Sequence, residues 1–169
     1  AYFELPTTLR NKQAVINVDS AEACFKYALL SVLHYKDMHK HRQRTSKYER
    51  WEDELNFSGV DINNINKAKD VPKIGQQNNI KINVHLWDGG LRGSRYNNSK
   101  VVASTTVNVL LVVNAQGQRH YCGIPSLARL YAHTKASHNM HKHMCERCCR
   151  SFKTQAGIDQ HYQWCSRGK

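Results

Sequence analysis

The chain has 169 residues, of which 25 are Lys or Arg and 13 are Asp or Glu, so its formal net charge is 25 − 13 = +12. Its 40% hydrophobic content can supply a core and excludes a disordered chain. The longest apolar run, residues 107–113, falls far short of the ~20 residues that span a membrane, so no membrane partner is expected. There is no signal-peptide pattern and no initiator Met, which predicts a fragment or processed product acting inside the cell, in nucleus or cytoplasm.

The first predicted elements are a turn at Leu5-Pro6 and a short strand at residues 14–18. A helix follows, with Asp19 or Ser20 as its N-cap. Its apolar stripe recurs at helical spacing and consists of Phe25, Ala28, Leu29, Val32 and Leu33. Residues 36–50 hold six Lys or Arg and two acidic residues, which predicts a surface loop or exposed helix forming a solvated face.

The middle of the chain alternates helix and strand signals. In order, the sequence predicts a helix opening at 70–74, a strand at 80–86, a loop at 88–99, a buried strand at 107–113, a hairpin turn at 114–117, a returning strand at 119–124, and a short helix or turn at 127–131. This succession indicates the α+β class.

Cysteine placement favours metal over disulfides. The six are Cys24, Cys122, Cys145, Cys148, Cys149 and Cys165, and four of them fall in the last 25 residues. A disulfide framework would spread across the fold that it staples, whereas clustering beside histidines indicates a metal site in a reducing compartment.

The strongest motif is Cys145-x2-Cys148-x12-His161-x3-Cys165. Three thiolates and an imidazole make a four-donor set that suits tetrahedral Zn²⁺, and the last two ligands lie one turn apart on a helix. Phe152 and Ile158 occupy the two core positions of a small ββα zinc finger, so the motif resembles the classical two-Cys two-His finger with its last His replaced by Cys. Chance clustering is the alternative, and Cys149 lies outside the spacing.

We therefore expect a main domain at 1–132, a basic linker at 133–144 and the finger at 145–169. From residue 132 onward there are 7 Lys or Arg and 2 acidic residues, 7 − 2 = +5. The helix positions that read DNA in the finger family would be Thr154, Gly157 and Gln160, and one finger covers only about three base pairs. This predicts salt-sensitive, sequence-blind contact with nucleic acid. Alternatively, the finger caps the main domain or binds protein.

A second constellation joins Cys24 to His120. A thiol nucleophile needs a lowered pKa, which a helix N-terminus and a nearby imidazole provide. A nucleophile on a leading helix with a base on a late strand is the papain-like order. Cys24 would be the nucleophile, His120 the base and Asp19 an orienting or oxyanion-loop residue. The alternative is a non-catalytic domain of the same fold, in which the cysteine is buried and the histidine is hydrogen-bonded within the core.

The segment Asp19-x4-Cys24-Phe25-x2-Ala28 and the pair His120-Tyr121 resemble the ovarian-tumour (OTU) cysteine proteases. The resemblance implies a papain-like or OTU-like domain acting as a protease, deubiquitinase or isopeptidase on a ubiquitin-like or polyprotein substrate. Two positions depart from the family: four residues rather than two separate Asp19 from Cys24, and Cys122 stands where the family often has Asn or Asp. Orientation of the imidazole would then fall to Asp19, Asn17 or Asp88, or to no residue.

A broader resemblance covers nearly the whole chain, through residues 4–11, 16–19, 24–25, 70–84, 120–130 and the terminal finger. Together these segments resemble the region ahead of the protein-primed family B DNA polymerase in Maverick/Polinton-type (adintovirus-like) mobile elements and related animal viruses. This resemblance implies a transposon or viral protein that works near DNA replication or virion processing.

Overall fold

The computed structural model describes residues 2–97, 103, 105–132, 143–145, 148 and 150–165. Within that part of the chain, no helix combines the length and apolar character needed to cross a membrane.

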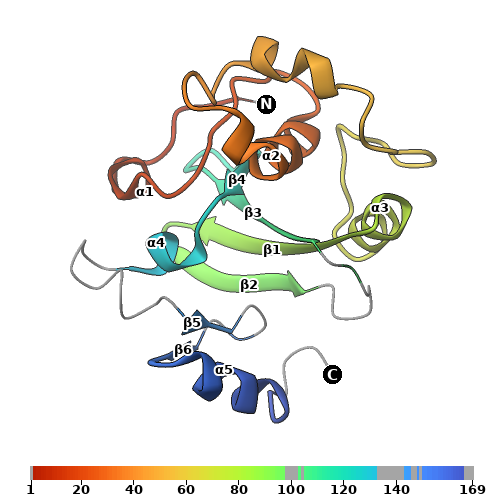
Figure 1. Ribbon diagram of the computed structural model, residues 1–169. Coiled ribbons are helices and arrows are strands. Elements are labelled where there is room, and N and C mark those ends of the chain that lie inside the picture. The colour runs from red at the N-terminus through yellow and green to blue at the C-terminus, as the bar shows by residue number, and fades with distance from the viewer. Residues whose placement is uncertain are drawn as a thin grey trace.

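The fold is α+β and is built on a four-stranded sheet in the order β2-β1-β3-β4 (Figure 1). The central strands β1 (Ile80–Asp88) and β3 (Thr105–Val113) run parallel. β2 (Leu91–Asn97) pairs antiparallel with β1, and β4 (Arg119–Ile124) pairs antiparallel with β3. Alternate side chains of each strand therefore face two different cores.

The first core lies between the sheet and the helices α2 (Cys24–Leu33) and α3 (Asp70–Asn78). The apolar stripe predicted for α2 is confirmed, with Phe25, Ala28 and Leu29 buried. They meet the odd-numbered valines and leucine of β3, together with Tyr121 of β4. A third, smaller core joins the outer side of α2 to the segment that follows it.

The start of α2 differs from the prediction, because neither Asp19 nor Ser20 caps it. The helix begins at Cys24, behind Ala23 in a left-handed conformation with φ 55°. The backbone N–H of Ala23 donates to Asn63 Oδ1 at 2.7 Å, a partner 40 residues away. Asp19 instead donates its backbone N–H to the carbonyl of Gln43 at 2.6 Å.

Three further elements depart from the sequence reading. The helix α1 (Thr7–Lys12) follows Pro6 where only a turn was predicted. The predicted strand at 14–18 is reduced to one bridge, in which Ile16 and Gly123 exchange backbone hydrogen bonds of 2.8 and 3.0 Å. The range 88–99, predicted to be a loop, contains β2.

The remaining predictions between residues 70 and 131 are confirmed. The structure forms α3, β1, β3, the turn after β3, β4 and the short helix α4 (Leu127–Tyr131). Residues 36–50 form no continuous helix. They contain most of two short 3-10 helices, η1 (Tyr35–Asp37) and η2 (Thr45–Trp51).

The opposite face of the sheet carries the second core, which is partly polar. Leu110, Val112 and Ile124 pack there with α1 and α4 residues. The same face buries Asn83 and His85 of β1. Asn83 donates to Asn108 Oδ1 at 3.2 Å, and His85 Nδ1 lies 2.8 Å from the Tyr131 hydroxyl.

Acid should destabilise the fold through His85. Burial lowers the pKa of His85 from 6.5 to about 4, against a smaller opposing effect of its hydrogen bond with Asn108. Between these values the unfolded chain binds more protons than the folded chain, so stability falls as pH drops from 6.5 towards 4, by about 3 kcal/mol. Urea unfolding at a series of pH values should show a shallower acid loss in His85→Gln than in the unmodified chain. Parallel profiles would contradict this assignment.

Candidate metal centre and thiol site

The C-terminal unit has ββα order. Its strands β5 (His143–Met144) and β6 (Ser151–Phe152) pair antiparallel and are followed by α5 (Gln155–Tyr162), drawn in blue in Figure 1. β5 covers the last two residues before the predicted finger and contacts α4 of the main sheet domain. The hairpin closes through the Cys145 backbone N–H, which donates to the Arg150 carbonyl at 2.9 Å.

The four predicted ligands come together at the junction of hairpin and helix. Cys145, Cys148, His161 and Cys165 place their donor atoms within 4.8 Å of one another, and this cluster could hold a metal ion. The Sγ atoms of Cys145 and Cys165 are 3.8 Å apart, and Cys148 Sγ lies 3.3 Å from His161 Nε2.

These separations fit the edges of a zinc tetrahedron. With Zn–S bonds of ~2.3 Å and Zn–N bonds of ~2.0 Å, two sulfur ligands lie ~3.8 Å apart, and a sulfur and a nitrogen ~3.5 Å apart. Cys145 and Cys165 are buried, while Cys148 and His161 are half-buried. Three thiolates so close together would repel one another strongly, which a dication between them would offset.

The small core around the ligands is that of the predicted finger. Ile158 is buried, and the Phe152 ring lies 4.6 Å from the His161 ring, which fixes the imidazole against the hairpin. Cys149, predicted to lie outside the ligand set, falls outside the described residues.

The finger helix offers little for reading bases. Thr154 is its N-cap, and its hydroxyl accepts from the Gly157 backbone N–H at 3.0 Å. A Cβ on Gly157 would come within 3.2 Å of the same hydroxyl. Of the three helix positions predicted to face bases, Gln160 is the one with an exposed side chain that does not cap the helix.

Cys24, the predicted nucleophile, is half-buried at the first position of α2 and packs against the first core. α2 packs against β4, the strand that carries His120. Burial is the main cause that raises the pKa of Tyr121 to about 12, and burial also raises the pKa of the Cys122 thiol.

His120, the predicted base, is fully buried in β4. The rings of Tyr2 and Phe3 pack edge-on against its imidazole, at centroid distances of 5.9 and 5.8 Å. Because neighbouring residues of a strand face opposite sides, His120 shares its side with Cys122 and the second core, and Tyr121 faces α2.

Asp19, the predicted orienting residue, is exposed, and its backbone bonds to the loop at residues 43–44. Asn17 lies closer to β4: its Oδ1 is 3.7 Å from Cys122 Sγ, and its Nδ2 donates to the Phe3 carbonyl at 3.2 Å. Asp19 therefore contacts the loop at residues 43–44, whereas Asn17 contacts β4.

Comparisons with protein-family models, with curated proteins and with solved structures found no match to this chain.

Sequence reasoning missed one basic cavity and one buried polar cluster. The cavity is lined by residues between 38 and 50, a range that the sequence indicated to be a solvated face. The polar cluster comprises Asn83, His85, Asn108 and Tyr131. Alternating polarity in residues 80–86 was its only signal in the sequence.

Proposed function

We propose that this chain is a zinc-binding, nucleic-acid-contacting module, of the kind expected in a replication protein of a Maverick/Polinton-type element or a related virus. The observation that carries the proposal is the convergence of four Cys and His donors, all within 4.8 Å of one another, in a strongly basic chain. Zinc would be held by Cys145, Cys148, His161 and Cys165, and its role would be to fold the finger.

Charge supports phosphate contact by both parts of the chain. Residues 132–169 carry +5, and residues 1–131 carry 18 Lys or Arg against 11 acidic residues, 18 − 11 = +7. Neutralising phosphates with Lys and Arg releases condensed counterions, and this term depends on salt but not on sequence. The engaged Thr154 hydroxyl and the missing side chain of Gly157 agree with such sequence-blind contact.

Binding to DNA should therefore weaken steeply with salt. If the zinc-loaded chain neutralises three phosphates of a short duplex, its affinity should fall about 40-fold between 50 and 200 mM salt. Fluorescence anisotropy with two duplexes of equal length and unrelated sequence would measure this, and the two affinities should agree within about twofold at each salt concentration. A flat response to salt would contradict the phosphate contacts, and a large difference between the duplexes would contradict sequence-blind binding.

A second candidate is an OTU-like cysteine protease or isopeptidase centred on Cys24. The observation that favours it is the position of this thiol at the start of α2, the helix that packs against the strand bearing His120. The His120 imidazole faces the second core, on the other side of β4 from Tyr121 and α2. Proton transfer to the Cys24 thiol would therefore require His120 to leave that side of the strand, as well as its packing against Tyr2 and Phe3. This requirement makes the enzyme the second candidate rather than the first.

Thiol reactivity separates the two candidates. In an enzyme, a thiolate-directed probe should modify Cys24 in the zinc-loaded chain, and His120→Ala should slow that labelling about 100-fold through loss of the base. Peptide mapping by mass spectrometry identifies the modified cysteine, and Cys24→Ala provides the background level. Equal labelling of the unmodified chain and of Cys24→Ala would exclude a protease or isopeptidase that uses Cys24 as its nucleophile.

A further inference from the structure

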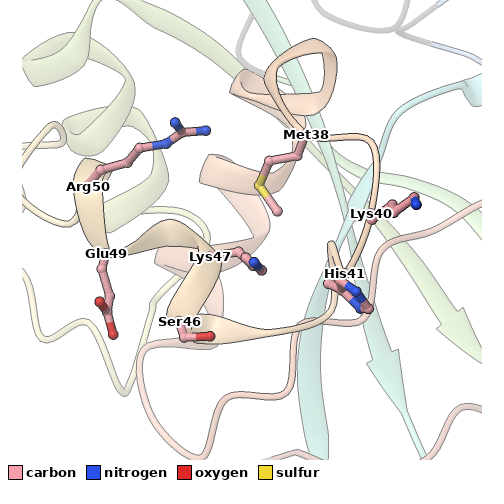
Figure 2. Close-up of a pocket in the computed structure, with 7 residues that line it drawn as sticks. All are labelled: Met38, Lys40, His41, Ser46, Lys47, Glu49 and Arg50. Carbon is pink, nitrogen blue, oxygen red and sulfur yellow. The ribbon is translucent and has the colours of Figure 1, made fainter.

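A cavity of about 580 Å³ opens beside η2, on the part of the main domain formed by residues 38–50 (Figure 2). Neither the four metal ligands nor Cys24 and His120 are among the residues that line this cavity. The residues that line it are Met38, Lys40, His41, Ser46, Lys47, Glu49 and Arg50.

The lining is cationic. The lining residues include three Lys or Arg and one acidic residue, Glu49, so they carry 3 − 1 = +2. Lys40, His41 and Lys47 are exposed, and none of them forms an ion pair or side-chain hydrogen bond with a residue that the structure describes. Figure 2 shows the ends of Lys47 and His41 near the same opening, with Lys40 on its far side. These charges are therefore available to an anion.

The loop that holds these charges is fixed by internal contacts. His41 adopts a left-handed conformation with φ 60°, and its carbonyl accepts from the Arg44 backbone N–H at 3.1 Å. The Tyr48 ring is fully buried, and its hydroxyl donates to the Arg42 carbonyl at 2.6 Å. The backbone N–H of Asp19, in the segment before α2, donates a hydrogen bond to the Gln43 carbonyl and so holds the loop to that segment. A loop held in this way loses little conformational freedom on binding.

The arginines around the cavity have structural contacts of their own. Arg42 stacks on the Tyr35 ring at 3.9 Å and donates to the Tyr35 carbonyl at 3.0 Å. Arg50 stacks on Trp51 at 3.9 Å. The two lysines are thus the lining cations without such a contact among the described residues, and lysine ammonium groups bind phosphates as point charges.

We propose that this cavity binds phosphate groups of a nucleic-acid strand, with Lys40 and Lys47 as the main contacts and Ser46 as a hydroxyl donor. The proposal deepens the proposed function by giving the main domain its own nucleic-acid contact. The volume suits a nucleotide-sized group, since ligand cavities run about 300–1,000 Å³. Met38, which is buried and also lines the cavity, offers an apolar surface beside the charged residues.

The test compares two pairs of substitutions with the same change in charge. Lys40→Gln/Lys47→Gln removes the cavity lysines, and Arg10→Gln/Lys69→Gln removes two exposed cations elsewhere on the domain. Both lower the formal net charge of the chain by 2, from +12 to +10 before the metal and its thiolates are counted. Anisotropy with a short DNA duplex should show at least a tenfold loss of affinity at ~0.1 M salt for the cavity pair, and a salt slope smaller by about 2.

Equal losses for the two pairs would overturn the cavity while leaving the proposed function intact. No DNA binding by the unmodified chain would overturn the proposed function and the cavity with it. A competition experiment adds polyphosphate or polyglutamate, at the same total charge, to the complex of DNA with the unmodified chain. Polyphosphate should displace the DNA more readily. If polyglutamate displaces it equally well, the ligand is an acidic protein, and the assignment to phosphate is overturned.

Discussion

Chelating the metal is expected to unfold residues 143–165 while the sheet of β1–β4 stays folded. The finger has two strands of two residues each and a helix of eight, with Ile158 as its buried aliphatic residue. So small a core cannot offset the conformational entropy of ordering its chain. Zinc binding supplies about 10–16 kcal/mol in isolated finger peptides, and here it should likewise decide whether the unit folds.

Limited trypsin digestion followed by mass spectrometry measures this effect site by site. Chelation should speed cleavage after Lys153, which lies between β6 and α5, by at least 100-fold, because the unfolded finger is then the dominant state. Cleavage after Lys81, inside β1, should stay slow.

Substitution of one ligand should have the same effect as chelation. Cys148→Ser should abolish stoichiometric zinc in native mass spectrometry, because a hydroxyl is a poor replacement for a thiolate ligand. Cys149→Ser, one residue away, is the matched control and should retain one zinc per chain. Retention of zinc by Cys148→Ser together with its loss from Cys149→Ser would show that the wrong cysteine had been assigned.

The second large effect is expected at Gly123, where β4 meets α2. A Cβ at this position would lie 2.2 Å from Ser31 Oγ, 2.9 Å from the Ala28 carbonyl oxygen and 2.9 Å from Val32 Cγ2. The backbone of α2 cannot retreat without opening the first core. Gly123→Ala should therefore cost about 3 kcal/mol, a large part of a typical total of 5–15 kcal/mol.

Thermal unfolding followed by circular dichroism measures this cost, and a loss of 3 kcal/mol should lower Tm by roughly 6–12 °C. Ser31→Ala on the Gly123→Ala background removes the closest contact but keeps the Ala28 carbonyl, so it should restore only part of the loss. A Gly123→Ala variant as stable as the unmodified chain would show that α2 is not packed against β4 at this point.

Long periodic segments allowed much of the main domain to be predicted. The stripe of α2 and the alternation or continuous apolar character of β1 and β3 each repeat over seven or more residues, so their geometry is encoded locally. The ligand cluster was predictable for a similar reason. A tight turn fixes the spacing of its first two cysteines. His161 lies on α5 as predicted, but that helix ends at Tyr162, so Cys165 follows it after a turn rather than lying on the helix itself.

The features that were missed depend on distant partners. The start of α2 is set by Ala23, whose N–H bonds to Asn63, and no local pattern could indicate a partner 40 residues away. β2 is a largely polar segment that forms a strand by pairing with β1 rather than by its own pattern. The basic cavity depends on the fold of the loop around Tyr48, which a reading of residues 36–50 as a charge run could not reveal.

The packing of α2 against β4 also bears on how the chain is made. From the end of α2 at Leu33 to the start of β4 at Arg119 the ribosome must add 119 − 33 = 86 residues. At ~5–20 residues per second, that interval lasts roughly 4–17 s. Throughout it, the apolar side of the nascent helix has no β4 to cover it, and it is a ready target for ribosome-associated chaperones.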